Sequence, residues 1–400
     1  MKDLAAFILA GGKGKRMGIL CKNRPKPVLP FGGKYRVIDF ALSNCINSKI
    51  SNIAVLTDYQ RSNIANYLQK WQVNSKKPSN IEVLEPKSHY LGTADAVYQN
   101  LKYLKDQKIE NILVLAADHV YSMDYRDIMA FHELNKANVT IGLSQVSREQ
   151  ASHLGTVTID SDNRVTNFAE KVNTDRDSLA SMGIYVFNVG TLIEYLCMDS
   201  ESNDSMHDFG YSIIPEMVNR SRVFGYKFDG YWRDIGTIEA YHAAHMELLN
   251  EQPGFVNESN WPVHTVRNSL VNSNISIKGR IINSIISPGC TIKGHVENSV
   301  ISPGVWIDEY AEVKNSIIMN NVFIGEHSLL DSSIIGKGVS IGKCCQIGSP
   351  DQKDGITVIE SDTIAPYTSI NGDVGGNLDM ALNELIRSST LSSSHEELLK

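Results

Sequence analysis

A glycine-rich stretch near the start of the sequence carries residue types suited to binding phosphate. Gly11, Gly12 and Gly14 follow a short apolar run, and such a turn leaves backbone N–H groups open to phosphate oxygens. Arg16 and Lys26 add positive charge on the same side, one as a planar fork and one as a point charge. Together these residues predict a cradle for the phosphates of a nucleotide.

Two better-known glycine loops do not fit this stretch. It matches neither the dinucleotide fingerprint G-x-G-x-x-G nor the P-loop G-x-x-x-x-G-K-[ST], because Met17 and Gly18 stand where those patterns need other residues. The remaining alternative is an ordinary glycine turn between a strand and a helix, since glycine is common in turns. The residues further along the chain favour the phosphate cradle.

Two aspartates are candidates for holding a metal ion. Asp118 follows a buried-type strand, and a carboxylate at that point lies at the ligand edge of an α/β sheet. Carboxylate oxygens are the ligands that Mg²⁺ prefers. Asp234 lies among aromatic and glycine residues, and the two would share one ion if the fold brings them together. The alternative role for Asp118 is to cap the following helix.

Two further short motifs are candidates for contacts with the rest of a substrate. Thr93 is placed to act as the N-cap of a helix, with the Gly92 backbone open to a base or ribose; simple capping is the alternative. Lys171 follows a strand beside Glu170, an arrangement that grips a monophosphate or a sugar hydroxyl. A solvated surface pair is the alternative for these two residues.

The first half of the chain alternates strands with helices. This alternation predicts a doubly wound α/β domain, whose ligands lie at the carboxyl ends of the strands. Strands are expected at residues 4–9, 53–56, 81–84, 112–117, 139–146, 155–159, 165–168 and 183–187, and helices at 63–71, 93–101 and 238–249.

From residue 275 onward, branched apolar residues recur every six positions. This is the hexapeptide signature of a parallel β-helix, in which three hexads make one triangular coil. The runs are Ile275 and Ile281; Ile286 and Ile292; Ile301, Ile307 and Val313; Ile318, Ile324 and Leu330; Ile335, Ile341 and Ile347; and Val358, Ile364 and Ile370. His295 and His327 stand alone in their hexads, so we assign this domain to assembly and regulation rather than to acyl transfer.

The expected domain organisation follows from these patterns. Residues 1–250 form the catalytic domain, 251–274 a linker, 275–375 the β-helix, and 376–400 a short helix with a flexible tail.

Composition narrows the class of protein further. The chain has 400 residues, a net charge of -7 and six cysteines without C-x-x-C spacing. This charge argues against nucleic acid or an anionic membrane as partner. The cysteine pattern favours free thiols in a cytoplasmic protein, and no apolar run approaches the roughly 20 residues needed to span a bilayer.

Taken in order, the motifs of this chain resemble those of the glucose-1-phosphate adenylyltransferase family. The motifs are residues 7–16 and 24–27, Phe31-Gly-Gly-Lys-Tyr-Arg36, Gly92-Thr-Ala-Asp-Ala96, Ala117-Asp-His119, Glu170-Lys171, Ser181-Met-Gly183, His207-Asp-Phe-Gly210 and Tyr231-Trp-Arg-Asp-Ile-Gly236. The resemblance covers nearly the whole chain. It implies an α/β doubly wound nucleotidyltransferase domain with a mostly parallel sheet, followed by a left-handed parallel β-helix domain.

The resemblance also implies an activity and an assembly. ATP and glucose 1-phosphate would react by Mg²⁺-dependent in-line transfer to give ADP-glucose and pyrophosphate, which supplies glycogen or starch synthesis. The enzyme would be a homotetramer, or a heterotetramer with a paralogous subunit.

Site roles follow from the same resemblance. Catalysis would fall to Arg16, Lys26 and Asp118, and the metal to Asp118 and Asp234. The nucleotide would contact Leu9, Ala10, Gly11, Gly12, Gly14, Gly92 and Thr93. The sugar phosphate would contact Tyr90, Gly155, Glu170, Lys171, Ser181 and Asp234.

Two alternatives stay open. Glu85, in the short segment before Tyr90, could meet the N–H groups of a guanine edge, so another nucleotide or hexose 1-phosphate is a second hypothesis. A non-catalytic regulatory subunit is the third, although such a subunit would be expected to lose the cradle or the carboxylates.

Overall fold

The computed structural model describes most of the chain. The described residues are 4–75, 80–250, 260–266, 276–349, 355–365 and 369–370. The tail expected at 376–400 lies outside them, and of the linker expected at 251–274 only residues 260–266 are described.

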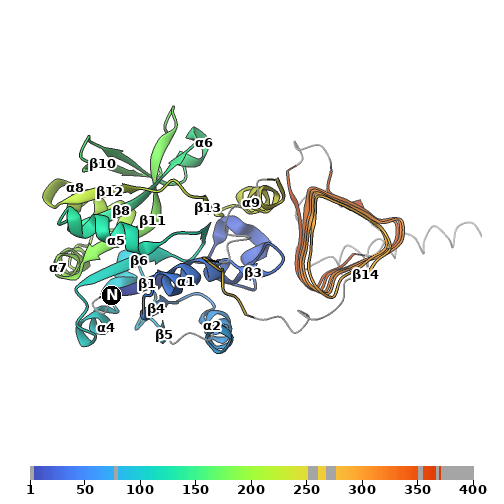
Figure 1. Cartoon of the computed structure of the whole chain (residues 1–400), viewed down its shortest axis with the longest axis horizontal. Coiled ribbons are helices and arrows are strands. Elements are labelled where there is room, and N and C mark those ends of the chain that lie inside the picture. Colours follow the sequence, from blue (N-terminus) through green and yellow to red (C-terminus); the bar gives the residue numbers. More distant parts are fainter. Residues whose placement is uncertain are drawn as a thin grey trace, which may run out of the picture.

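A nine-stranded sheet forms the centre of the first domain (Figure 1). Its strands are β1 (Leu4–Leu9), β4 (Asn52–Leu56), β5 (Asn80–Leu84), β6 (Asn111–Ala116), β8 (Val139–Val146), β9 (Gly155–Ile159), β10 (Val165–Glu170), β11 (Ser178–Asn188) and β12 (Val223–Lys227). They run in the order β10-β9-β11-β6-β1-β4-β5, with β8 attached to β11 and β12 to β8. The neighbours β6, β1, β4 and β5 are parallel, whereas β11 is antiparallel to β6, β8 and β9.

Helices pack on both faces of this sheet (Figure 1). They are α1 (Ile38–Asn47), α2 (Arg61–Ser75), α3 (Thr93–Tyr98), α4 (Leu101–Asp106), α5 (Tyr125–Leu134), α6 (Arg148–Ala151), α7 (Val189–Ser200), α8 (Ile214–Arg220) and α9 (Ile238–Asn250). Three short turns of other helix types are η1 (Lys15–Cys21), η2 (Lys26–Val28) and η3 (Phe209–Ile213).

Strand β1 shows why the sheet is buried on both sides. All its residues are apolar, as is typical of strands in parallel sheets covered by helices. Ala6 and Ile8 pack into the core that contains α1 and α2, whereas Ala5 and Phe7 pack into the core that contains α3 and α7. The strand is therefore held firmly, and the loop after it starts from a fixed point.

The second domain is a three-sided parallel β-helix, seen end-on as a triangle in Figure 1. One side holds β14 (Ser276–Ile277), β17 (Thr291–Ile292), β20 (Trp306–Ile307), β23 (Phe323–Ile324), β26 (Ser340–Ile341) and β29 (Ile364–Ala365). The next holds β15 (Arg280–Ile282), β18 (His295–Glu297), β21 (Glu312–Lys314), β24 (Leu329–Asp331), β27 (Gln346–Ile347) and β30 (Ser369–Ile370). The third holds β16 (Ile285–Ile286), β19 (Val300–Ile301), β22 (Ile317–Ile318), β25 (Ser333–Ile335) and β28 (Thr357–Ile359).

The six-residue pattern gives the inward side chains of the β-helix except in the last coil. There Ile359 and Ala365 face the core, one residue after Val358 and Ile364 of the six-residue recurrence. The register is set by pairing with the preceding coil, where Ile359 lies opposite Ile335. Val358 instead packs toward the first domain, and Ile364 is exposed. Ile275 lies outside the described residues.

Two two-stranded sheets of the first domain lie outside its main sheet, namely β2 (Pro30–Phe31) with β3 (Tyr35–Arg36), and β7 (His119–Tyr121) with β13 (Trp232–Asp234).

The two domains share a hydrophobic core beside α9 (Figure 1). Phe31 and Tyr241 of the first domain share the core with Ile317 and Ile334 of the β-helix. An ion pair of 3.1 Å between Lys22 and Glu360 adds to the contact.

The predicted fold class, an α/β nucleotidyltransferase domain followed by a parallel β-helix, is confirmed. Within the described ranges, none of the helices has the length and apolar character that a bilayer crossing requires.

Candidate active site

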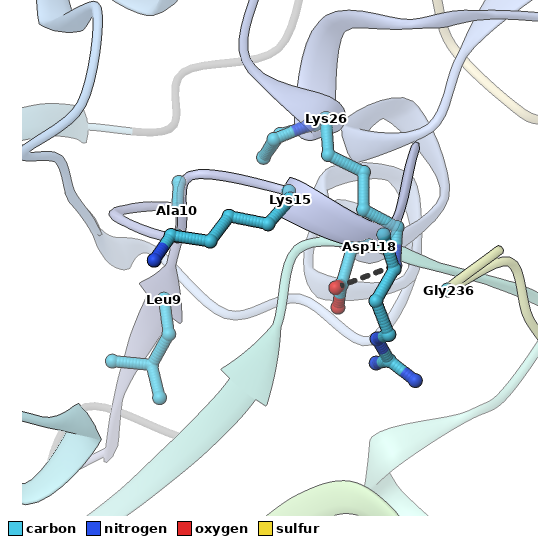
Figure 2. A pocket seen from close by; sticks show the side chains of 10 residues that line it. Leu9, Ala10, Lys15, Lys26, Asp118 and Gly236 are labelled. Carbon is cyan, nitrogen blue, oxygen red and sulfur yellow. Dashed lines mark hydrogen bonds and ion pairs between the residues drawn. The ribbon is translucent and has the colours of Figure 1, made fainter. Parts of the chain in front are cut away.

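The carboxyl ends of β1, β4 and β6 meet at one edge of the sheet. These neighbouring parallel strands end at Leu9, Leu56 and Ala116. A first cavity of about 250 Å³ opens there (Figure 2). It is lined by Leu9, Ala10, Gly12, Gly14, Lys15, Arg16, Lys26, Pro27, Asp118 and Gly236. The expected cradle and the first carboxylate therefore lie around one space.

The glycines of the loop after β1 differ in their surroundings. Gly14 has a φ of 61°, a conformation that favours glycine, and it is the N-cap of η1. A Cβ on Gly12 would meet no atom within 4 Å, so this residue faces open space at the cavity. Ala10 lines the cavity too, but its N–H donates to the Leu56 carbonyl and is not offered to a ligand.

Lys26 lies between the two predicted carboxylates. Its Nζ donates to Asp118 Oδ2 at 2.8 Å and to Asp234 Oδ1 at 3.4 Å, and the residue is 5% exposed. Figure 2 shows the lysine side chain reaching Asp118. Asp234 comes close because β13 pairs with β7 and places it opposite His119. The structure thus brings together residues that lie far apart in the sequence.

Burial and neighbouring charges shift the pKa values of Lys26 and Asp118. Burial lowers the pKa of Lys26, but the neighbouring Asp118 and Asp234 carboxylates raise it, and the net direction is upward. Burial raises the pKa of Asp118, but the Lys26 ammonium holds it well below its usual range. Both groups are therefore charged at neutral pH, and the carboxylate is ready to bind a cation.

Arg16 lies near Asp234, since both come close to Gly236. It lines the first cavity and also a third cavity of about 310 Å³, which Asp234, Gly236 and His153 line as well. Its Nη2 lies 3.1 Å from the position that a Cβ on Gly236 would take. The glycine therefore leaves room for the guanidinium beside the carboxylates.

A second cavity of about 430 Å³ continues from the first and shares Leu9, Gly12 and Asp118 with it. Its other lining residues are Gly11, Leu56, Asp58, Tyr90, Gly92, Thr93, Ala96, Ala116, Glu170, Lys171, Gly183, Tyr185, Asp208, Phe209 and Gly210. Asp118 thus stands where the two spaces join.

Gly92 and Thr93 line the second cavity in a different way from that predicted. Gly92 itself is the N-cap of α3, so the prediction of Thr93 as N-cap is wrong. The Thr93 hydroxyl donates to Asp208 Oδ2 at 2.8 Å and accepts the N–H of Phe209. The first N–H groups of α3 donate to the His207 carbonyl, which lies so close that it leaves no space for a Cβ on Gly92.

Glu170 and Lys171 form an ion pair at the wall of the second cavity. Lys171 Nζ lies 2.9 Å from Glu170 Oε1 and 5.1 Å from the centre of the Tyr211 ring. Burial lowers the pKa of Lys171, but Glu170 raises it, and the net direction is upward. The ammonium is therefore held beside the cavity and stays charged.

Two predicted sugar-phosphate residues lie behind the cavity wall. A Cβ on Gly155 would come within 2.5 Å of the Phe168 ring and 2.7 Å of Glu170 Oε2. The Ser181 hydroxyl donates to the Tyr185 hydroxyl at 3.0 Å, and the residue is buried. Neither is among the lining residues, so both support side chains that are.

The structure adds two acidic residues that the sequence reasoning did not assign. Asp58 lies two residues after the end of β4, as Asp118 does after β6, so the same strand-end rule would have found it. Its carboxylate pairs with His89 at 2.8 Å and accepts the Tyr90 N–H. Asp208 was recognised only as part of a motif, and it lines the second cavity.

Glu85, the candidate for a guanine edge, does not line either cavity. Its carboxylate pairs with Arg61 at 3.1 Å and is more than half exposed. Asp58 is the carboxylate that lies in the second cavity beside Tyr90.

A possible metal site lies at the centre of this arrangement. Asp118, His119 and Asp234 each offer one ligand atom, and these atoms lie within 4.8 Å of one another. Two carboxylate oxygens fit a hard divalent cation. The two aspartates are the predicted pair, and the histidine was not assigned a role in the sequence.

Two family models match the chain. Residues 5–251 match the model described as Nucleotidyl transferase, and residues 266–363 match the one described as GlmU-like, C-terminal hexapeptide. The first match covers more than half of the 400 residues.

Several curated relatives carry one name. The chain is 42% identical over 275 residues to a glucose-1-phosphate adenylyltransferase of Thermomicrobium roseum, a match covering 66% of this chain and 64% of the relative. A glucose-1-phosphate adenylyltransferase of Pseudothermotoga lettingae is 44% identical to the chain over 262 residues, a match covering 63% of this chain and 62% of the relative. The protein of the same name from Clostridium novyi is 39% identical over 299 residues, a match covering 70% of this chain and 78% of the relative.

The match covers less than two thirds of the first two relatives' length. The resemblance seen in the motifs is nevertheless confirmed, since the match to the Clostridium novyi relative covers 78% of that protein. The chain belongs to the nucleotidyl transferase family and, within it, to the glucose-1-phosphate adenylyltransferase family.

Proposed function

We propose that the protein is a glucose-1-phosphate adenylyltransferase, which converts ATP and α-D-glucose 1-phosphate into ADP-glucose and pyrophosphate. The observation that carries this proposal is the placement of Lys26 between Asp118 and Asp234 at the junction of two cavities. One cavity is bordered by the glycine loop, and the other by Lys171. The name shared by the relatives supports the same activity.

The reaction is a direct transfer between phosphates. An oxygen of the sugar phosphate attacks the α-phosphorus of ATP, the bond from that phosphorus to the bridging oxygen breaks, and pyrophosphate leaves with the bridging oxygen. No covalent bond to the protein is needed. Positioning of two anions and neutralisation of their charge therefore supply the catalysis.

The first cavity suits the β- and γ-phosphates of the nucleotide. Gly11, Gly12 and Gly14 offer backbone close to the cavity, while Arg16 and Lys26 neutralise the charge that passes to pyrophosphate. Lys26 is fixed in place by its two carboxylate partners, so it is already oriented before the reaction.

Asp118 and Asp234 would hold Mg²⁺ beside Lys26. The bound ion would draw charge from the phosphate oxygens and hold the two substrates in line. The low pKa of Asp118 favours this role, because the ion then has no proton to displace from that carboxylate.

The second cavity suits the base and the sugar phosphate. Tyr90, Gly92 and Thr93 border the part next to the glycine loop, and Lys171 is placed to bind the phosphate of glucose 1-phosphate. Glu170 orients that lysine. Gly155 and Ser181 lie behind the wall of this cavity. Gly155 leaves space for the Glu170 side chain, and the Ser181 hydroxyl donates a hydrogen bond to Tyr185.

We also propose that the protein works in the cytoplasm as a homotetramer, or with a paralogous subunit. All six cysteines are free, which suits a reducing compartment. One side of the β-helix exposes Trp306, Phe323 and Ile364, and such apolar surface supports assembly.

The test is pyrophosphate release by the purified chain with Mg²⁺ and glucose 1-phosphate, across ATP, GTP, UTP and dTTP. We expect ATP to be preferred. Preference for another nucleotide would overturn the adenylyl assignment and make Asp58 the first residue to examine, because it lies in the cavity beside Tyr90.

Release must also depend on this chain and not on a contaminant. The matched control is the Asp118→Asn protein purified in the same way. Pyrophosphate release that is equal in both preparations would count against the assigned site. No release with any nucleotide would overturn the proposal in favour of a regulatory subunit.

A further inference from the structure

His119 is held in one orientation next to the catalytic aspartates. Its side chain is 9% exposed, and its Nδ1 lies 2.9 Å from the Met182 carbonyl oxygen. A carbonyl only accepts hydrogen bonds, so Nδ1 carries the proton and donates it. In the neutral imidazole, which is the form that binds metals, the lone pair is then on Nε2, the other ring nitrogen.

The surrounding residues are shaped to admit this imidazole. Gly183 has a φ of 64°, and a Cβ there would come within 3.2 Å of His119 Cε1. The Trp232 ring packs edge-on, with ring centres 5.2 Å apart and planes at 86°. The ring of His119 is thus fixed by a hydrogen bond, by space left at a glycine and by an aromatic contact.

Nε2 of His119 is aimed at the gap between the carboxylates. It lies 3.6 Å from Asp118 Oδ1 and 3.6 Å from Asp234 Oδ1. Lys26 bonds Asp118 through the other oxygen, Oδ2, so Oδ1 stays directed toward the histidine. Neighbouring ligands of one metal ion, with bonds of about 2.1 Å, lie roughly 3–4 Å apart.

We propose that His119 Nε2 is a third protein ligand of the metal ion, beside Asp118 and Asp234, and that it raises the affinity of the site for Mn²⁺ and Co²⁺ more than its affinity for Mg²⁺. This inference rests on the proposed metal-dependent nucleotidyl transfer. A site of two carboxylates alone offers only hard oxygen ligands, which suit Mg²⁺. An imidazole nitrogen adds affinity for the transition metals, following the general order of divalent affinities.

The bond between His119 and Met182 supports the ligand role. Histidines that bind metals usually donate their second ring N–H to a carbonyl or carboxylate, which fixes the tautomer and the ring orientation. The Nδ1–H of His119 does this with the Met182 carbonyl. The carbonyl lies in β11 at the point where the register shifts between Ser181 and Tyr185. This irregularity of the strand thus serves to orient the ligand.

The test is Mn²⁺ binding followed by electron paramagnetic resonance, with the metal alone and the full chain. Pulsed spectra of bound Mn²⁺ should show coupling to a directly bonded ¹⁴N nucleus. In His119→Gln this coupling should be lost, and Mn²⁺ binding should weaken by about 10-fold or more, with a smaller change for Mg²⁺. The matched control is His153→Gln, which changes an exposed histidine of the third cavity and should keep the coupling.

A second measurement needs no variant. Wild-type protein with ¹⁵N-labelled histidine should replace the ¹⁴N pattern with that of ¹⁵N, so the result holds even if His119→Gln fails to fold. Bound Mn²⁺ without nitrogen coupling, coupling that survives in folded His119→Gln, or no Mn²⁺ binding at millimolar concentration would overturn the inference. Pyrophosphate release is measured on the same samples, so failure of the inference and failure of the proposed function are told apart.

Discussion

Replacement of Lys26 by methionine should lower the stability of the metal-free protein by about 3 kcal/mol. Methionine keeps most of the side-chain length and removes the charge. The two carboxylates that Lys26 contacts, Asp118 and Asp234, then face each other without their cation. The change thus tests whether this ion-pair cluster stabilises the fold of the active site.

The magnitude follows from the two distances. With an effective dielectric constant of about 20, Coulomb's law gives roughly 6 kcal/mol at 2.8 Å and roughly 5 kcal/mol at 3.4 Å. The lost hydration of the buried ammonium offsets most of this attraction, and removal of one partner of a buried pair costs about 3–5 kcal/mol. The Asp118 side chain is 36% exposed, so solvent screens it and the lower end applies.

The assay is thermal and urea unfolding of both proteins in EDTA at pH 7. A loss of about 3 kcal/mol corresponds to a fall in Tm of about 6–12 °C for a domain of this size. The control is Lys13→Met, which changes an exposed lysine of the same loop and should alter stability by less than about 0.5 kcal/mol.

The pH dependence gives a second check. The pKa of Asp118 is lowered in the folded protein, so its contribution to stability is present above the unfolded value of about 4 and is lost as pH falls further. The difference in the free energy of unfolding between wild type and Lys26→Met should therefore become smaller below about pH 4. An unchanged Tm at pH 7, or a difference that persists at low pH, would refute the reasoning.

Three other substitutions test separate parts of the structure. Asp118→Asn should lower turnover by about 10²-fold or more with an unchanged circular dichroism spectrum, because an amide does not replace a charged metal ligand; near-normal pyrophosphate release would contradict the site. Gly92→Ala should lower the free energy of unfolding by about 1–3 kcal/mol, because the new Cβ would clash with the His207 carbonyl. Gly12→Ala is the control, because it adds a Cβ to open space. Equal melting temperatures for the two variants would contradict this geometry. Burial raises the pKa of Asp39 to about 6, so the folded state keeps a proton that the unfolded state loses, and wild-type stability should fall by up to about 3 kcal/mol between about pH 4 and 6. Urea unfolding at pH 4 and 7 should show a smaller fall in the free energy of unfolding for Asp39→Asn than for the wild type. An identical fall in both proteins would rule out Asp39 as the cause.

Local patterns gave the parts of the site that follow directly from a strand. The glycine loop comes after a fully apolar strand, and Asp118 comes two residues after another. Parallel strands of one sheet end at the same edge, so these residues had to meet. Asp58 obeys the same rule after β4, and it also lies at this edge, in the second cavity.

Other predictions failed where a distant contact decides the local structure. Thr93 was predicted as the N-cap of α3, but the His207 carbonyl takes the first N–H groups of the helix and the threonine hydroxyl turns to Asp208. Gly155 was expected in the sugar-phosphate site only because the family resemblance implies it. It lies behind the wall, where Phe168 leaves no room for a side chain.

The β-helix shows the same limit on a smaller scale. Its hexads are local, so the fold and the earlier coils could be identified from spacing alone. The last coil follows a longer connection, and a one-residue shift of β28 and β29 leaves the six-residue spacing between Ile359 and Ala365 intact. Only pairing of Ile359 with Ile335 decided which residue faces the core.

The sequence by itself determined the class of both domains, the glycine loop and the candidate carboxylates, because each depends on residues that are near one another in the chain. The tertiary structure decided which of them meet. Asp234 reaches Asp118 because β13 pairs with β7. Lys26 is held by both carboxylates, and the His119 ring is oriented by a carbonyl of β11 and by the Trp232 ring of β13. These contacts join distant segments through backbone pairing and burial, and no local spacing in the sequence encodes them.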